Sequence, residues 1–386
     1  MDTPGAPEIT WRDRGAERRG RWLSPSSPPP PAAVGEAGDT TTAAAALARV
    51  RRGEGLLYRG DYHNARQLLA ALRRRLDRTL SGREGRRGGG GPERAWRVER
   101  ERRRLEHELL SRVLVPVEPG PTVPLRRAPD VSAALNEALA PLPELPGLLP
   151  LRDLLGMIGA HEWRRRGVEV PALGARVHPH YGVYAPVRGE YVDLVAAAAA
   201  EWPVAGRRAL DVGTGTGVLA LVLARAGATV IATDVEPRAV ACARENAERL
   251  GLAARVEVVR ADLFPPGQAD LVVSNPPWLP GDAHGPLERA VYDPGGVLLE
   301  RLVSGLPAAL APGGEAWIVL SDLGELLGLR PAGHVAALAG RAGLRVADVR
   351  AARAAHPRAR DEDDPLHAWR AREVTRLFRL VRAQPG

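Results

Sequence analysis

The sequence has 386 residues, a formal net charge of +8 and one cysteine. This length allows one full α/β domain and a smaller one, since single domains usually have about 100 to 200 residues. Cys242 alone cannot form an intrachain disulfide, and no stretch approaches the roughly 18 apolar residues of a membrane span, so we expect a cytoplasmic protein without a membrane segment. All 54 basic residues are arginine, which indicates a compositional bias, so the positive charge alone is weak evidence for nucleic-acid binding.

The N-terminal part of the sequence shows helical patterns but no strand patterns. Residues 1–42 are rich in Pro, Gly, Ser and Arg without apolar periodicity, which predicts a disordered tail. From residue 43 onward apolar positions recur three and four apart. After a glycine run at 88–91, the charged stretch 94–112 is typical of a solvated helix with ion pairs, which we favour over an RNA-binding helix. We therefore expect a helical, arginine-rich region over residues 43–175.

From residue 176 to residue 386, short apolar strands alternate with helical segments, as in a parallel sheet with crossover helices. The expected strands are 208–212, 229–234, 255–260, 269–274 and 315–321, and the expected helices are 218–226, 237–250 and 296–310. Two further strand patterns, 343–352 and 373–382, can pair antiparallel. The sequence thus predicts an α/β fold with a doubly wound, seven-stranded, mostly parallel sheet, an arrangement that resembles the Rossmann-like fold of S-adenosylmethionine methyltransferases.

A glycine loop follows the first of these strands. Glycines at a strand-to-helix turn let a ligand approach the bare backbone. A dinucleotide-binding loop would have G-x-G-x-x-G, but position 218 is valine, and the spacing D-x-G-x-G-x-G resembles the first motif of class I methyltransferases. We therefore expect S-adenosyl-L-methionine as the cofactor, bound by Asp211, Gly213, Thr214, Gly215 and Gly217.

Two acidic residues follow the next two strands. Asp234 is placed to accept hydrogen bonds from ribose hydroxyls, and Asp262 from the adenine amino group, with Leu263 and Phe264 flanking the ring. Upstream, segment 177–186 resembles the proline-containing segment that lies over the cofactor in this family, and its Tyr184 is a candidate packing residue. Its histidines have no partner at a ligand spacing, so no metal site is expected.

The segment after the fourth strand is the most specific signal in the chain. It matches the [D/N/S]-P-P-[aromatic] motif of N-methyltransferases that act on exocyclic amines or amides, and consists of Ser274, Asn275, Pro276, Pro277 and Trp278. The Asn275 side-chain oxygen and the Pro276 carbonyl can bind the two N–H groups of a planar nitrogen and orient its lone pair without a strong base. The prolines stiffen this loop, and Trp278 is expected to stack on the acceptor.

The acidic Gly-Gly segment at 287–296 narrows the resemblance to HemK-type glutamine methyltransferases and the related small methyltransferase domains, over about residues 180 to 320. The resemblance implies an N-methyltransferase with a macromolecular partner: a protein such as a release factor or ribosomal protein, through its glutamine amide, or a base of ribosomal or transfer RNA. Tryptophan in place of the usual tyrosine and the larger N-terminal region depart from the family. The alternatives of another class are an NAD(P)-binding oxidoreductase and a silent binding module.

Overall fold

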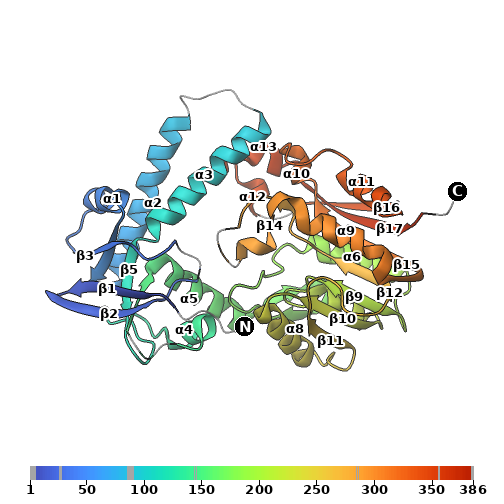
Figure 1. Ribbon diagram of the computed structural model, residues 1–386, viewed down its shortest axis with the longest axis horizontal. Helices are drawn as coiled ribbons and strands as arrows, with labels where there is room; N and C mark the ends of the chain where they lie inside the picture. Colours follow the sequence, from blue (N-terminus) through green and yellow to red (C-terminus); the bar gives the residue numbers. More distant parts are fainter. Residues whose placement is uncertain are drawn as a thin grey trace. The chain divides into compact units, whose positions relative to one another are not determined.

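The computed structural model describes residues 6–25, 28–84, 91–142, 144, 146–283, 285, 287–354 and 357–383. The chain forms two compact units: Met1–Gly90 with Arg97–Glu162, and Gly91–Trp96 with Trp163–Gly386 (Figure 1). The expected boundary at residue 176 is therefore wrong. The hairpin of β7 (Val168–Val170) and β8 (Ala175–Val177) already packs into the core of the second unit. No helix in the described ranges is long and apolar enough to cross a membrane.

The first unit contains a six-stranded mixed sheet, in the order β1-β2-β6-β5-β4-β3. Its strands are β1 (Glu8–Asp13), β2 (Ala16–Trp22), β3 (Ala33–Gly38), β4 (Glu54–Arg59), β5 (Val113–Val117) and β6 (Gly147–Pro150). A disordered tail over residues 1–42 is wrong for residues 6–25 and 28–42, because three strands lie there. In β1 every second side chain is buried, and Trp11 and Trp22 join one apolar cluster.

Helices lie between and after these strands, and two of them extend into the second unit at residues 92–96 and 163–166, so the expected all-helical region contains both strands and helices. The helices are α1 (Ala43–Arg51), α2 (Tyr62–Glu84), α3 (Pro92–Leu110), α4 (Ser132–Leu139) and α5 (Leu151–Arg166). Most of the glycine run at 88–91 lies outside the described residues. Helix α3 does form over the charged stretch, but it is not simply solvated, because Glu99 is buried and ion-paired with Arg102 and Arg103.

The second unit is built on a seven-stranded sheet with the order β11-β10-β9-β12-β15-β17-β16. Its strands are β9 (Arg208–Val212), β10 (Thr229–Asp234), β11 (Val256–Arg260), β12 (Ala269–Ser274), β15 (Leu310–Ser321), β16 (Leu344–Arg353) and β17 (Val374–Arg382). The first five in spatial order are parallel, and β17 is antiparallel to both of its neighbours. The predicted doubly wound sheet with an antiparallel end pair is confirmed.

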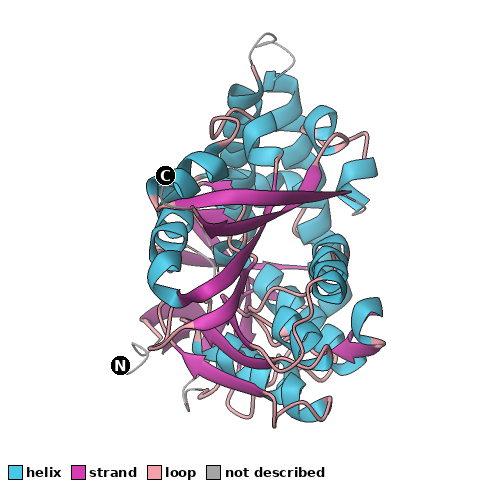
Figure 2. Cartoon of the chain, turned by 90° about the vertical axis from the view of Figure 1, so that its right-hand side faces the viewer, coloured by secondary structure: helices cyan, strands magenta, loops and turns pink. Residues whose placement is uncertain are grey.

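Helices cover both faces of this sheet, which twists strongly from strand to strand (Figure 2). Successive residues of β12 alternate between two apolar clusters: Leu271 and Val273 pack in one, Val272 in the other. The first cluster takes in α6 (Glu190–Glu201), α7 (Val218–Arg225) and α8 (Pro237–Arg249), and the second α9 (Val297–Ala309) and α11 (His334–Arg341). The strand order reverses between β9 and β12, so the carboxyl ends of these strands define the crevice in which such sheets bind ligands.

Candidate active site

The glycine loop between β9 and α7 has the conformation that its sequence requires. Gly213, Gly215 and Gly217 all have positive φ angles, of 74°, 54° and 84°. A Cβ atom at Gly213 or Gly215 would meet no atom within 4 Å, so the loop leaves open space above its backbone. At Gly217 a Cβ would lie 3.2 Å from the backbone of Ala243 in α8, so this glycine is needed for packing. The loop can therefore admit a ligand at its first two glycines.

Asp211 holds this loop through hydrogen bonds. It is buried, and one carboxylate oxygen accepts hydrogen bonds from the Thr214 hydroxyl at 2.6 Å and from the Ala220 amide at 3.1 Å. Burial raises the pKa of Asp211 to about 6. Asp211 and Thr214, both predicted cofactor residues, thus contact each other, and these hydrogen bonds position the loop.

Replacing Asp211 by Asn is expected to change how stability depends on pH. The folded protein holds the Asp211 proton up to about pH 6, whereas an ordinary aspartate loses it near 3.8. The contribution of this group to stability is therefore complete below about pH 3.8 and is lost as the pH rises through about 6. The unfolding free energy of the D211N variant minus that of wild type should therefore rise by up to about 3 kcal/mol as the pH increases from 4 to 7. Urea unfolding across this range measures the difference, and parallel curves would contradict the prediction.

Asp234 ends β10 beside the same loop. Its two carboxylate oxygens accept one backbone N–H each, from Gly215 and Glu236, both at 3.0 Å, and each oxygen has a further lone pair for a ligand. Burial raises the pKa of Asp234. The next residue, Val235, is an apolar side chain with 51% exposure, held through its carbonyl by Arg260. Sequence reasoning missed Val235, although an isolated valine between two acidic residues at a strand end was a usable signal.

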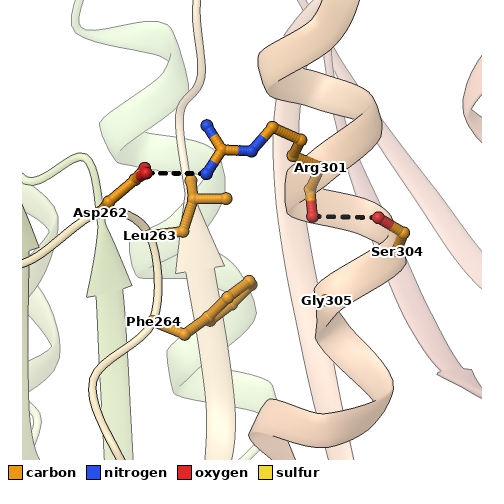
Figure 3. A pocket seen from close by; sticks show the side chains of 6 residues that line it. All are labelled: Asp262, Leu263, Phe264, Arg301, Ser304 and Gly305. Carbon is orange, nitrogen blue, oxygen red and sulfur yellow. Dashed lines mark hydrogen bonds and ion pairs between the residues drawn. The ribbon is translucent and has the colours of Figure 1, made fainter.

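Asp262 and Leu263 follow β11 and line a cavity of about 380 Å³ (Figure 3). Asp262 is 60% exposed and ion-paired at 2.7 Å with Arg301 of α9. Leu263 has a φ of +66°, a strained conformation for a branched side chain, and its carbonyl accepts a hydrogen bond from Thr233. Phe264, which was predicted beside the ring together with Leu263, also lines this cavity. The remaining lining residues, Arg301, Ser304 and Gly305, were not predicted from the sequence.

Hydrogen bonds tie the ends of four strands together. The Thr233 carbonyl accepts the amides of Gly213 and Thr214, both at 2.9 Å, while its hydroxyl donates to Leu263. On the other side, the buried Ser274 hydroxyl donates to the Val212 carbonyl at 2.8 Å. The glycine loop, the loops after β10 and β11, and the acceptor segment after β12 therefore form one bonded edge of the sheet.

The segment upstream of α6 is fastened to α8. Asn246, which is fully buried, accepts the His178 amide at 2.8 Å and donates to the Thr216 carbonyl of the glycine loop at 3.0 Å. Tyr184 is half-buried. Burial, together with Tyr184 and Asp211, raises the pKa of Tyr191. Asn246 was missed by sequence reasoning because its partners lie far away in the chain.

The acceptor segment presents a bent loop directly after β12. Pro276 is buried and the Asn275, Pro277 and Trp278 side chains are partly exposed. The Asn275 side-chain oxygen accepts the indole N–H of Trp278 at 2.7 Å, which fixes the amide plane. An amide oxygen has two lone pairs, so one is left for a substrate N–H. The sequence did not foresee this contact, and a tyrosine at position 278 would have no indole N–H to make it.

Two arginines hold Trp278. The Arg188 guanidinium lies over the indole ring, 4.5 Å from its centroid, and is itself bonded to Glu190 and Glu373. Arg330, which is 8% exposed, donates to the Trp278 carbonyl. Because Arg188 covers part of the ring, a planar acceptor has access only to what remains of the indole surface. This limits the stacking that was expected of Trp278.

The Gly-Gly segment proves to be structural. Both carboxylate oxygens of the buried Asp293 accept amides at the start of α9, from Leu298 at 2.9 Å and Leu299 at 3.0 Å. Gly295 and Gly296 have positive φ angles, of 67° and 74°. The short strands β13 (Leu279–Pro280) and β14 (Tyr292–Asp293) pair and support the acceptor loop.

No group of three or more His, Cys, Asp or Glu side chains that could hold a metal occurs among the residues with described positions. His180 instead bonds Glu245 at 2.7 Å. Cys242 is fully buried in α8, and burial raises the pKa of its thiol to about 12, so it cannot act as a nucleophile in the site.

Comparison with known proteins finds a family match in the second unit. Residues 192–326 match the family described as "Methyltransferase small domain". The chain is 40% identical over 165 residues to the release factor glutamine methyltransferase of Cereibacter sphaeroides, covering 39% of this chain and 57% of that protein. It is 45% identical over 97 residues to the ribosomal protein L11 methyltransferase of Pelotomaculum thermopropionicum, covering 24% and 32%. The chain thus spans about half, or less, of the length of these relatives.

Among solved structures, the chain is similar to the 16S rRNA N2 G1207 methyltransferase of T. Thermophilus in complex with AdoMet and guanosine. The identity is 19%, the TM-score is 0.38, and the similarity covers 56% of this chain and 50% of that one.

Proposed function

We propose that this chain is an S-adenosylmethionine-dependent N-methyltransferase of the HemK type, which is supported by the match of residues 192–326 to the methyltransferase small domain family and by the order of the seven-stranded sheet. The observation that carries the proposal is the acceptor segment. Asn275 and Pro276 lie at the end of β12, and the Ser274 hydroxyl bonds that end to β9 just before the glycine loop. The alternative function, an NAD(P)-binding oxidoreductase, assigns no role to this segment.

The residues present fit the cofactor. The open space above Gly213 and Gly215 suits a ligand lying against bare backbone, and the two Asp234 oxygens suit a vicinal diol. Val235 and Leu263 offer apolar surface for a purine ring. Asp262 offers a carboxylate to the amino group of that ring once its exposed ion pair with Arg301 separates. Tyr184, which is half-buried in the segment upstream of α6, is the residue proposed to cover the ligand. When bound, the sulfonium supplies an electrophilic methyl group.

The chain's own residues then orient the nucleophile. The free lone pair of the Asn275 side-chain oxygen and the Pro276 carbonyl would accept the two N–H groups of an amide, turn its lone pair out of conjugation, and disperse the charge that develops on nitrogen. Pro276 and Pro277 restrict φ and so hold these acceptors in place. The indole N–H of Trp278 and the Arg330 guanidinium keep the loop rigid.

We assign a protein glutamine amide as the acceptor. The relatives named release factor glutamine methyltransferase support this choice, and so does the part of the Trp278 ring covered by Arg188, since a nucleobase needs an open aromatic face. A substrate of the translation machinery would place the enzyme in the cytoplasm.

The test is incubation of the full chain with methyl-labelled cofactor and either purified bacterial release factor or total RNA. We expect label in the protein, at glutamine, and none in the RNA. Label only in RNA would overturn the amide assignment. Label in neither, with NADH rather than S-adenosylhomocysteine binding in calorimetry, would overturn the whole proposal.

A further inference from the structure

Helix α2 of the first unit carries a local excess of positive charge. Between Tyr62 and Thr79 it has five arginines, all exposed, against one acidic residue. The arginines are Arg66, Arg73, Arg74, Arg75 and Arg78. The one acidic residue of this stretch, Asp77, is ion-paired with Arg102 of α3 at 2.9 Å. A coding bias that replaces lysine by arginine leaves the balance of basic and acidic residues unchanged, so it does not explain this excess.

Most of this charge lies on one side of the helix. Arg66, Arg73 and Arg74 recur seven and eight positions apart, which brings them to one face. Arg78 follows Arg74 by four positions and extends the face. From Arg66 to Arg78 this face spans roughly 18 Å at about 1.5 Å per residue. That is several times the roughly 3.4 Å rise per phosphate of one nucleic-acid strand, and longer than a mononucleotide needs.

The same face borders a cavity of about 650 Å³, formed by α2, α3 and α5. Its apolar lining includes Leu69, Leu110 and Leu155, one from each helix. Its polar and charged lining residues are His63, Arg66, Gln67, Arg73, Glu106 and Arg152. The one acid, Glu106, is already ion-paired with Arg73 at 2.9 Å, so the cavity keeps an excess of positive charge.

We propose that this face of α2 and the adjoining cavity bind a single strand of nucleic acid. The arginines contact phosphates spaced along the strand, and one base enters the cavity, where the leucines supply an apolar wall and the Gln67 amide a donor and an acceptor. An acidic peptide would satisfy the arginines but would leave the apolar wall and the amide unused. The surface lies wholly in the first unit and does not depend on the proposed catalytic function.

The test is fluorescence anisotropy of the full-length chain with a labelled 16-nucleotide RNA of mixed sequence and with the same sequence as DNA, at several salt concentrations. The variant combines R66Q, R73Q and R74Q. The matched control combines R12Q, R51Q and R52Q, which removes the same charge from exposed positions of the first unit outside α2. RNA and DNA arms show which strand binds more tightly, and binding of either at this face supports the proposal.

We expect the α2 variant to weaken binding at least about tenfold at 100 mM salt and to reduce the salt slope by about 2, since each lost single-strand contact removes about 0.7. The control should stay within about twofold of wild type. Equal loss in both variants, or no binding by wild type, would overturn the proposal. So would displacement of the RNA by oligoglutamate at an equal concentration, which would assign the face to acidic proteins. Circular dichroism spectra and melting temperatures equal to those of wild type show that the variants are folded.

Discussion

Replacing Asn275 by alanine is expected to lower kcat at least about a hundredfold while leaving S-adenosylhomocysteine affinity nearly unchanged. The Asn275 side chain bonds to Trp278, whereas Asp234 bonds to Gly215, so the contacts proposed for the cofactor are kept. The amide nucleophile loses one of its two oriented acceptors, which matters only when charge develops on nitrogen. Single-turnover methylation of release factor and calorimetry with S-adenosylhomocysteine measure the two effects. Unchanged turnover would mean that Asn275 does not orient the nucleophile.

The control for this variant is Trp278→Phe. Asn275 also accepts the indole N–H of Trp278, so alanine at 275 removes two contacts at once. Phenylalanine at 278 keeps a ring under Arg188 but has no N–H, and therefore removes only the internal contact. We expect W278F to lower turnover much less than N275A, because the Asn275 oxygen that binds substrate remains and only the contact that fixes its amide plane is lost. If both variants lose activity equally, Asn275 acts by holding Trp278 and not by binding substrate.

Asp234→Ala is expected to weaken cofactor binding first, raising the dissociation constant of S-adenosylhomocysteine by roughly a hundredfold. Hydrogen bonds to a charged group contribute about 1.5 to 3 kcal/mol each, and two ribose hydroxyls would lose theirs. The bond that the carboxylate accepts from Gly215 is lost as well, which loosens the loop. With cofactor at saturation, turnover should recover most of its wild-type value.

Asp270→Ala is the matched control for this variant. Asp270 also accepts a backbone amide at a strand terminus, that of Arg208 at 2.9 Å, but at the amino end of β9. The D270A variant therefore removes a carboxylate and its hydrogen bond to a backbone amide at a position away from the crevice. Cofactor affinity within about threefold of wild type is expected there, as for the loss of one surface contact. An equal fall in both variants would mean that Asp234 supports the fold and does not bind ribose.

The strands of the second unit could be predicted closely because buried parallel strands are short, continuous apolar runs. Strands β9, β10 and β12 coincide with the expected ranges. The same rule failed in the first unit. There β1 alternates exposed polar residues with buried ones, but β2 has four exposed residues in a row. Both strands lie in a segment rich in proline and glycine, so no strand pattern was recognised.

The candidate site was only partly predictable. Motif spacing identified the glycine loop, Asp234 and Asn275, because these lie at strand ends that the topology brings together. It could not identify Arg188 or Arg330, since arginine is so frequent in this chain that no single one stands out, and their bonds to distant segments exist only after folding. Motif spacing also could not show that the carboxylates of Asp211 and Asp293 accept hydrogen bonds from backbone amides.

The position of β17 has a consequence for the order of events during synthesis. β16 leaves the ribosome first, yet its only neighbour in the sheet is β17, which lies between it and β15. Until residues 374–382 emerge, β15 remains an open edge of the sheet with a long apolar run, and β16 has no strand with which to pair. A nascent chain halted before that point would expose a template for aggregation, so the final strand is the step that closes the domain.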